Sequence, residues 1–189
     1  MSARDALIAS VTGLVRRRGV AGTGLAALLE DSGVARRTLY LNFPGGKAEL
    51  VTEATRRAGQ ELASAIRTAE GDDVAQAVQT FIDMWKAQLG ATHMQAGCPI
   101  VAAILGRSEA PAAAQAASAA VREWQEILAD RLIVGGAGPD IARSLATLMV
   151  AAIEGAVILA VATESTDPLD DVGRHLLEVI RLHLPSDAR

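Results

Sequence analysis

The sequence predicts an all-α fold, and three observations support this prediction. Apolar residues recur at intervals of three and four through most of the chain, which is the period of an amphipathic helix. No segment keeps the alternation of apolar and polar residues that is typical of a half-buried strand. Glycines and prolines fall between the periodic segments, where they end helices. We therefore expect a three-helix N-terminal head, joined by a long helix to a larger α-helical domain.

Four helices are expected in the first third of the chain. Ser2 and Asp5 have the spacing of a capping box and begin the first helix. Gly33 follows the second helix, at a position where a left-handed residue commonly ends one. Pro44 separates the third helix from a long connecting helix. The expected ranges are 4–18, 24–32, 35–43 and 47–70.

The rest of the chain is expected to form a second helical domain. Gly71-Asp72-Asp73 ends the connecting helix, and the later breaks also fall at glycine or proline. The Ala-rich segment 110–120 is predicted to be helical, because alanine is the strongest helix former and an amphipathic segment follows it. The expected helices are 74–90, 99–106, 111–133, 139–163 and 169–184, so the domains are 1–47 and 71–189 with the connector between them.

Composition limits the location of the protein and its broad class. Half of the 189 residues are hydrophobic, which suffices for a sizeable core, and one cysteine excludes an intramolecular disulfide. The N-terminal residues lack an apolar signal core, so a cytoplasmic location is expected. Segment 145–162 is apolar enough to suggest a membrane span, but Glu154 at its centre favours a buried helix.

Segment 33–43 has the pattern of the turn and second helix of a helix-turn-helix. At about 100° per residue, Leu39 and Phe43 share one face of this helix, and Arg37 and Tyr40 lie on the opposite face. Arginine binds guanine edges or phosphates, hydroxyl groups bond phosphates, and leucine contacts thymine methyl groups. We therefore expect this helix to read DNA. The predicted DNA-binding residues are Thr23, Gly24, Arg36, Arg37, Thr38, Tyr40, Leu41, Asn42 and Lys47.

The net charge of −4 is unevenly distributed along the chain, in a way that agrees with a DNA-binding head. Residues 1–47 carry seven basic and three acidic side chains, a net charge of +4, which leaves −8 for the remainder. A positive head on a negative body would orient the protein toward DNA, with strongly salt-dependent binding. A merely solvated basic cluster is the alternative, but these charges coincide with a patterned helix-turn-helix. Lys47, at the start of the connecting helix, is expected to bind the sugar-phosphate backbone of DNA. The alternative is that Lys47 is an exposed lysine without a functional role.

The head resembles the TetR family of bacterial repressors. The matching residues are Arg18-Gly19-Val20, Gly24-Leu25-Ala26-Ala27-Leu28-Leu29, Gly33-Val34, Thr38-Leu39-Tyr40 and Phe43, and Pro44-Gly45-Gly46-Lys47 and Gly97-Cys98-Pro99-Ile100 resemble the LmrA/YxaF-like branch. This resemblance implies an all-helical homodimer that binds a palindromic operator as a ligand-responsive regulator. A repressor would then be released when a small molecule enters its second domain, while an activator role stays open.

Two positions depart from the family pattern. Ala35 stands where the family often has a capping serine. Without the serine hydroxyl, the start of this helix is expected to be less stable by about 1 kcal/mol unless a phosphate or a water molecule replaces the cap. Asn42 stands where the family often has histidine, and it keeps one donor and one acceptor. An alternative function follows from these departures, namely a helical small-molecule-binding protein that has lost operator recognition.

The last two helices are predicted to form a homodimer interface. Between residues 141 and 159 apolar residues cover more than one face, and Gly155 and Ala156 allow close approach. Pairing both helices with their copies would give a four-helix interface and two heads for successive major grooves. A monomer that uses these faces for its own core is the alternative.

A lipophilic or planar small molecule is the expected effector, because the second domain carries many apolar side chains and few aromatic or charged ones. Methionine and tryptophan residues in helices more often belong to the hydrophobic core than to a ligand pocket. The number of such candidates is therefore better evidence for a pocket than any single residue. Polar candidates beside these are His93 and Gln125. The predicted effector-binding residues are Phe81, Met84, Trp85, Leu89, Met94, Cys98, Ile104, Trp124, Leu128, Met149, Ile153 and Glu154.

No catalytic residue, metal site or cofactor is predicted. His93, His175 and His183 lie far apart, and no Cys/His pair has the spacing of metal ligands. Cys98 precedes Pro99 at an expected helix start, where the positive helix end lowers a thiol pKa. A redox switch therefore stays open beside the stronger interpretation of a buried structural cysteine.

Overall fold

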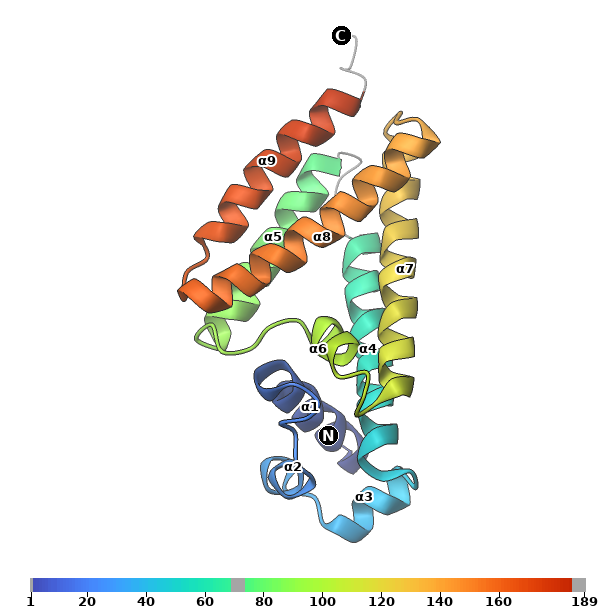
Figure 1. The fold of residues 1–189 in the computed structure, drawn as a ribbon, viewed down its shortest axis with the longest axis vertical. Coiled ribbons are helices and arrows are strands. Elements are labelled where there is room, and N and C mark those ends of the chain that lie inside the picture. The colour runs from blue at the N-terminus through green and yellow to red at the C-terminus, as the bar shows by residue number, and fades with distance from the viewer. Residues whose placement is uncertain (1, 69–73, 185–189) are drawn as a thin grey trace. The chain divides into compact units, whose positions relative to one another are not determined.

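The computed structural model describes residues 2–68 and 74–184 (Figure 1). Within these ranges the chain forms nine α-helices and no strand, so the all-α prediction is confirmed. The predicted ends agree with the described ends to within two residues, whereas the connector end at 70 and the break at 71–73 lie outside the described residues. The helices are α1 Ala3–Arg18, α2 Leu25–Ser32, α3 Arg36–Asn42, α4 Gly46–Thr68, α5 Val74–Ala91, α6 Pro99–Leu105, α7 Pro111–Val134, α8 Pro139–Thr163 and α9 Asp167–His183.

Local signals set the helix ends in the head. The Ser2 hydroxyl accepts a hydrogen bond from the Asp5 backbone N–H at 3.1 Å, which confirms the predicted cap of α1. Gly33 ends α2 with φ +65°, a left-handed conformation that glycine adopts without strain. Ala35 precedes α3 and provides no side-chain cap.

The chain packs into two compact units that do not follow chain order. The first unit is Met1–Glu61 with Ala96–Ala120, and the second is Leu62–Gln95 with Val121–Arg189. Helix α6 packs on α1 within the first unit, so the head receives a helix that sequence ranges alone did not assign to it. The predicted functional division at 1–47 and 71–189 stays a prediction.

A pair of backbone and side-chain bonds attaches the segment before α6 to α1. Arg16 Nε donates to the Gly97 carbonyl at 2.8 Å, and the Gly97 N–H donates to the Arg16 carbonyl at 3.1 Å. Burial lowers the pKa of Arg16, as expected for a guanidinium removed from water. The tertiary partner of α1 is therefore fixed by contacts across about eighty residues of chain.

In the second unit α5, α8 and α9 pack against one another (Figure 1). Gly173 on α9 allows this approach, since a Cβ there would lie 2.5 Å from Ile82 Cδ1 on α5. Among the described helices, only α8 is long and apolar enough to cross a membrane. Eight of its 25 residues are buried, so the expectation of a buried helix in place of a membrane span stays a prediction.

Candidate functional site

The apolar face of α3 anchors this helix in the core of the first unit. Leu39 and Phe43 are both buried, as their spacing predicts. The Arg4 guanidinium lies 4.8 Å from the centre of the Phe43 ring, and its Nη2 forms an ion pair with Glu53 Oε1 at 2.9 Å. These contacts hold α3 against both α1 and α4.

The opposite face of α3 is exposed. Arg36 and Arg37 are exposed, and Tyr40 and Leu41 keep 45% and 73% of their surface accessible. This distribution confirms the face assignment made from helical spacing. A leucine with this exposure contributes little to the core, so its position is available for contact with another molecule.

The turn between α3 and α4 positions Tyr40. Gly46 has φ +66°, and a Cβ added to it would lie 3.1 Å from Tyr40 Cε1. Glycine therefore allows both the left-handed backbone and the close approach of the ring. The Gly45 N–H donates to Glu49 Oε2 at 2.7 Å, which ties the turn to the first residues of α4.

Two predicted DNA contacts already have partners within the protein. Asn42 Nδ2 donates to the Thr38 carbonyl at 2.8 Å, and Lys47 Nζ donates to the Val20 carbonyl at 3.0 Å. An ammonium group has three N–H donors, so this bond leaves two of them to Lys47. Phosphate contacts by both residues stay predictions.

The structure places Thr23 differently from the prediction. Its side chain is fully buried, and its hydroxyl donates to the Gly19 carbonyl at 2.7 Å. The expected contact between this side chain and DNA therefore needs correction, because the hydroxyl stabilises the turn before α2 instead. Gly24 is exposed at the N-cap of α2 without a side-chain cap, so only backbone N–H groups are presented there.

The positive charge of the head is less accessible than a residue count suggests. Arg4 is paired with Glu53, and Arg16 is half-buried against the Ala96 and Gly97 carbonyls. Arg17 and Arg18 remain exposed on α1, as do the two arginines of α3. The expected attraction to phosphate therefore depends mainly on these four side chains.

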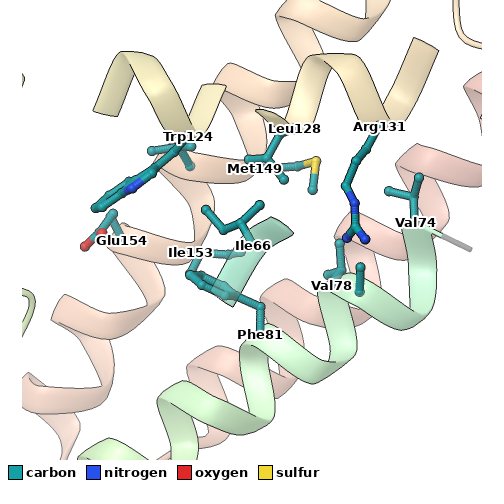
Figure 2. Close-up of a pocket in the computed structure, with 12 residues that line it drawn as sticks. Ile66, Val74, Val78, Phe81, Trp124, Leu128, Arg131, Met149, Ile153 and Glu154 are labelled. Carbon is teal, nitrogen blue, oxygen red and sulfur yellow. The ribbon is translucent and has the colours of Figure 1, made fainter. Parts of the chain in front are cut away.

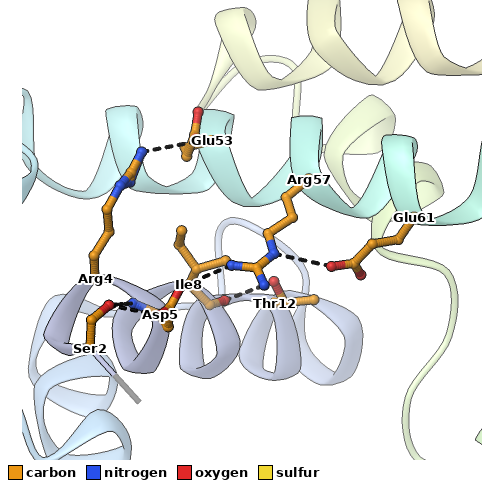
Figure 3. Close-up of polar contacts among 8 residues, drawn as sticks. All are labelled: Ser2, Arg4, Asp5, Ile8, Thr12, Glu53, Arg57 and Glu61. Carbon is orange, nitrogen blue, oxygen red and sulfur yellow. Dashed lines mark hydrogen bonds and ion pairs between the residues drawn. The ribbon is translucent and has the colours of Figure 1, made fainter.

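An ion cluster between α1 and α4 was not predicted. Arg57 on α4 pairs with Asp5 on α1 and with Glu61 on its own helix, each at 3.1 Å (Figure 3). The Ser2 hydroxyl and Arg57 both hydrogen-bond to the Asp5 carboxylate and hold its pKa below the ordinary value. Asp5 and Arg57 are 52 residues apart in the sequence, so no local spacing predicts their contact.

The second unit holds a narrow apolar cavity of about 40 Å³ (Figure 2). Helices α4, α5, α7 and α8 supply its walls, and six predicted effector residues contribute to them. Those six are Phe81, Trp124, Leu128, Met149, Ile153 and Glu154.

Six other candidates lie away from this cavity. Trp85 and Leu89 are buried in the core, and Trp85 stacks edge-on against Phe81 with ring centres 6.5 Å apart. Met84 is half-buried on the same helix, and Met94 follows it with φ +59°. The remaining two, Cys98 and Ile104, belong to the first unit. None of the six lines this cavity, because composition does not define which helix face meets it, and their contact with an effector stays a prediction.

Two of the polar candidates, His93 and Gln125, also lie outside the cavity. His93 is exposed after α5, and Gln125 Nε2 donates to Thr147 Oγ1 at 3.1 Å. Cys98 is buried at the start of α6, which agrees with the structural interpretation, while a redox role stays a prediction. Among the residues that the structure describes, no three metal-binding side chains are grouped.

Residues missed by sequence reasoning complete the cavity wall. Val74 and Val78 precede Phe81 at helical spacing on α5, and Arg131 follows Trp124 and Leu128 in the same way on α7. Helical spacing was therefore a usable signal. Arg131 was overlooked because arginine is usually assigned to the surface, although its aliphatic stem packs well against apolar walls.

Comparison with known proteins supports one family. The model of the LmrA/YxaF-like transcriptional regulator C-terminal domain matches residues 74–175. The uncharacterized HTH-type transcriptional regulator Rv0196 of Mycobacterium tuberculosis is 35% identical over 98% of each chain. LmrA of Bacillus subtilis, also an HTH-type transcriptional regulator, is 29% identical over 88% of this chain and 90% of its own.

Solved structures show the same fold. A TetR regulatory protein from Rhodobacter sphaeroides superposes with a TM-score of 0.84 at 19% identity, covering 93% of this chain and 97% of its own. The relatives are regulators rather than enzymes, which agrees with the predicted absence of a catalytic role. With the helix-turn-helix head and the matched second domain, the chain belongs to the LmrA/YxaF-like branch of the TetR family of DNA-binding transcriptional regulators.

Proposed function

We propose that this protein is a cytoplasmic, ligand-responsive repressor that binds a palindromic operator as a homodimer. The observation that carries the proposal is α3, which exposes two arginines, a tyrosine and a leucine from a firmly buried base. Such a helix can enter the major groove with its side chains directed at base edges and phosphates.

An uncovered apolar face on α8 supports the homodimer. Ile141, Leu148 and Leu159 are 39%, 43% and 53% exposed, and their spacing places them on one face. Gly155 lies on this face, where an added Cβ would meet no described atom within 4 Å. A second copy of this face would bury these side chains and allow close helix approach.

The cavity in the second unit supports a ligand response. At about 40 Å³ it is far smaller than the several hundred Å³ that a drug-sized ligand occupies. A ligand must therefore separate the helices that line it, and α4 is one of these through Ile66. Only three residues separate α3 from the start of this helix, so its displacement would change the spacing of the two reading heads. A shift of a few ångströms would prevent simultaneous contact with both half-sites.

The first test is binding to DNA upstream of the protein's own gene, at several salt concentrations. The wild type is compared with a variant that carries Arg37→Ala and Tyr40→Ala. Arg122→Ala, an exposed arginine of α7, is the matched control. We expect sequence-selective, salt-dependent binding by the wild type and the control, and its loss in the double variant. Equally weak binding to any DNA by all three, with no operator found in a genome-wide selection, would favour the ligand-binding alternative.

Sedimentation analysis tests the homodimer. A charge placed on the α8 face by Leu148→Arg should shift the protein toward monomer. Leu105→Arg on α6, where the leucine is 79% exposed, should leave the dimer intact. A wild type that sediments as a monomer at micromolar concentration would contradict this part of the proposal.

A further inference from the structure

We propose that the groove between α1 and α4 in the first unit is a small-molecule site that takes an aromatic monocarboxylate. The carboxylate of the ligand would bind Arg17 at one end of the groove, and its apolar body would lie between the two helices. This site is separate from the cavity of the second unit. Its ligand would bridge the first helix of the head and the connecting helix.

The groove is large enough for such a molecule. Its volume is about 340 Å³, within the range of small-molecule sites, whereas the cavity of the second unit has about 40 Å³. Its walls come from α1 and α4 residues of the first unit. Small and apolar residues leave space between the helices and favour a flat apolar body. These wall residues are Ile8, Ala9, Gly13, Ala54 and Ala58.

The charges at one end of the groove already balance one another. Arg57 forms ion pairs with Asp5 and Glu61, each at 3.1 Å, so its guanidinium lies between two carboxylates (Figure 3). Farther along the groove, the Thr12 hydroxyl donates to the Ile8 carbonyl at 2.8 Å. These groups have partners within the protein and need none from a ligand. A second anionic group at this end of the groove would meet the two acidic side chains and be repelled by them.

The opposite end carries positive charge without a carboxylate. Arg16 lines this end, and the Arg17 side chain folds back over Gly13, where an added Cβ would lie 3.4 Å from Arg17 Nη2. Arg16 Nε and Nη2 donate to the Gly97 and Ala96 carbonyls, so neutral groups hold this guanidinium. Within residues 2–68 and 74–184, no ion pair involves Arg16 or Arg17.

The two guanidinium groups also repel each other. Burial, and to a smaller extent the charge of Arg17, lowers the pKa of Arg16. Because Arg16 already bonds the segment before α6, it supplies a fixed charge, whereas the exposed Arg17 can bond a ligand. A carboxylate would bind the Arg17 guanidinium through two parallel hydrogen bonds and offset the repulsion. This end of the groove therefore favours one anionic group.

The contrast between the two ends discriminates between classes of ligand. Asp5 and Gly13 are eight residues apart on α1, which corresponds to about 12 Å along the helix axis. A body of two aromatic rings fits this length. A neutral molecule of the same shape would leave the repulsion between Arg16 and Arg17 unchanged, and a dicarboxylate would place its second charge beside Asp5 and Glu61. A monocarboxylate agrees with both ends and fixes the direction of the ligand along the groove.

Three matched probes test this assignment. They are biphenyl-4-carboxylate, its neutral carboxamide and biphenyl-4,4′-dicarboxylate, which share a body and differ only in their end groups. Affinities are measured on the full chain by isothermal titration calorimetry. We expect the monocarboxylate to bind about tenfold or more tightly than the carboxamide, since a hydrogen bond between two charged groups is the stronger one. The dicarboxylate should bind more weakly than the monocarboxylate.

Nuclear magnetic resonance locates the bound monocarboxylate. The backbone amide signals of Ala9 and Gly13, which line the groove, should shift on titration. The methyl signal of Met149, in the wall of the second-unit cavity, should stay in place at the same probe concentration. These signals separate binding in the groove from binding in the cavity.

Two variants assign the carboxylate end and the apolar body. Arg17→Gln should weaken the monocarboxylate about tenfold and leave the carboxamide unchanged. Arg18→Gln, at the next exposed arginine of α1, is the matched control and should change neither affinity. Ala9→Phe, at an exposed position of the groove wall, should weaken all three probes because the ring fills the groove. Circular dichroism melting checks that each variant is folded.

Any one of three results would overturn the assignment. The first is a monocarboxylate that fails to bind at millimolar concentration or binds no more tightly than the carboxamide. The second is an affinity for the monocarboxylate that Arg17→Gln leaves unchanged. The third is a shift of the Met149 signal without shifts at Ala9 and Gly13. None of these measurements uses DNA, so their outcome does not depend on the proposed repressor function.

Discussion

Helix α3 and the apolar cavity of the second unit hold their candidate functional side chains in opposite ways. Helix α3 exposes polar groups from a small buried base, whereas the cavity encloses apolar groups with a charged residue at each end. The exposed side chains of α3 can therefore change without loss of folding. Those of the cavity belong to the core of the second unit, so substitutions there affect both stability and binding. The following predictions test this difference, from the largest expected effect on stability to the smallest.

Phe43→Ala should produce the largest effect because it removes the base on which α3 rests. We expect a loss of about 3–5 kcal/mol in the free energy of unfolding, measured by urea denaturation. The neighbouring substitution Leu41→Ala, at a side chain that is 73% exposed, should change this free energy by at most about 0.5 kcal/mol. Similar losses for the two variants would contradict the described face assignment.

Met149→Ala should show the double role of the cavity wall. The side chain is buried, so its truncation should destabilise the protein by about 2–5 kcal/mol. The enlarged cavity should also accept bulkier apolar ligands, which is measured by their protection against thermal unfolding. A destabilised variant that gains no affinity for such ligands would show that Met149 is core alone.

Gly173→Ala tests the close approach of α9 and α5. The new methyl group would lie 2.5 Å from Ile82 Cδ1, so we expect destabilisation of about 1–3 kcal/mol. Ile82→Val removes this atom, and the double variant should therefore be more stable than Gly173→Ala alone. Additive losses in the double-mutant cycle would exclude a direct clash.

Arg37→Ala should leave stability within about 0.5 kcal/mol of the wild type, because the side chain is exposed. Operator affinity should nevertheless fall by about 1–3 kcal/mol if Arg37 contacts a base edge. A uniform loss on all DNA, with a reduced salt slope, would instead identify a phosphate contact. Fluorescence anisotropy with matched and mismatched operators distinguishes these outcomes.

Asp5 should produce the smallest effect, and this effect depends on pH. Its pKa is lowered in the folded protein by the Ser2 hydroxyl and Arg57, so its contribution is present at neutral pH. That contribution is lost as the pH falls below about 4, through the lowered folded pKa. Asp5→Asn should therefore reduce the difference between the urea midpoints at pH 7 and pH 3. Asp130→Asn, at an exposed carboxylate of the second unit, should leave this difference nearly unchanged.

Most of the fold and much of the recognition face could be predicted from the sequence. Helix ends at Ser2, Gly33 and Pro139 follow from capping and proline chemistry, which acts between neighbouring residues. The buried positions of Leu39 and Phe43 follow from helical spacing alone.

The cavity could be predicted only in part. Trp85 and Phe81 are both aromatic residues of α5, but only Phe81 lines the cavity. Composition cannot separate them, because the choice depends on which helices cover each face of α5. Thr23 is a similar case, since its burial depends on how the turn before α2 folds back on Gly19.

The sequence by itself determined the helices, their ends and the polar face of α3, because these depend on propensity, capping and periodicity over a few residues. The tertiary structure alone decided the partners of distant residues. It brought Arg57 to Asp5, attached the Gly97 segment to α1, and placed Glu154 and Arg131 at the two ends of one cavity. Such contacts join residues from separate helices, and no local pattern encodes them because they depend on how whole faces pack together.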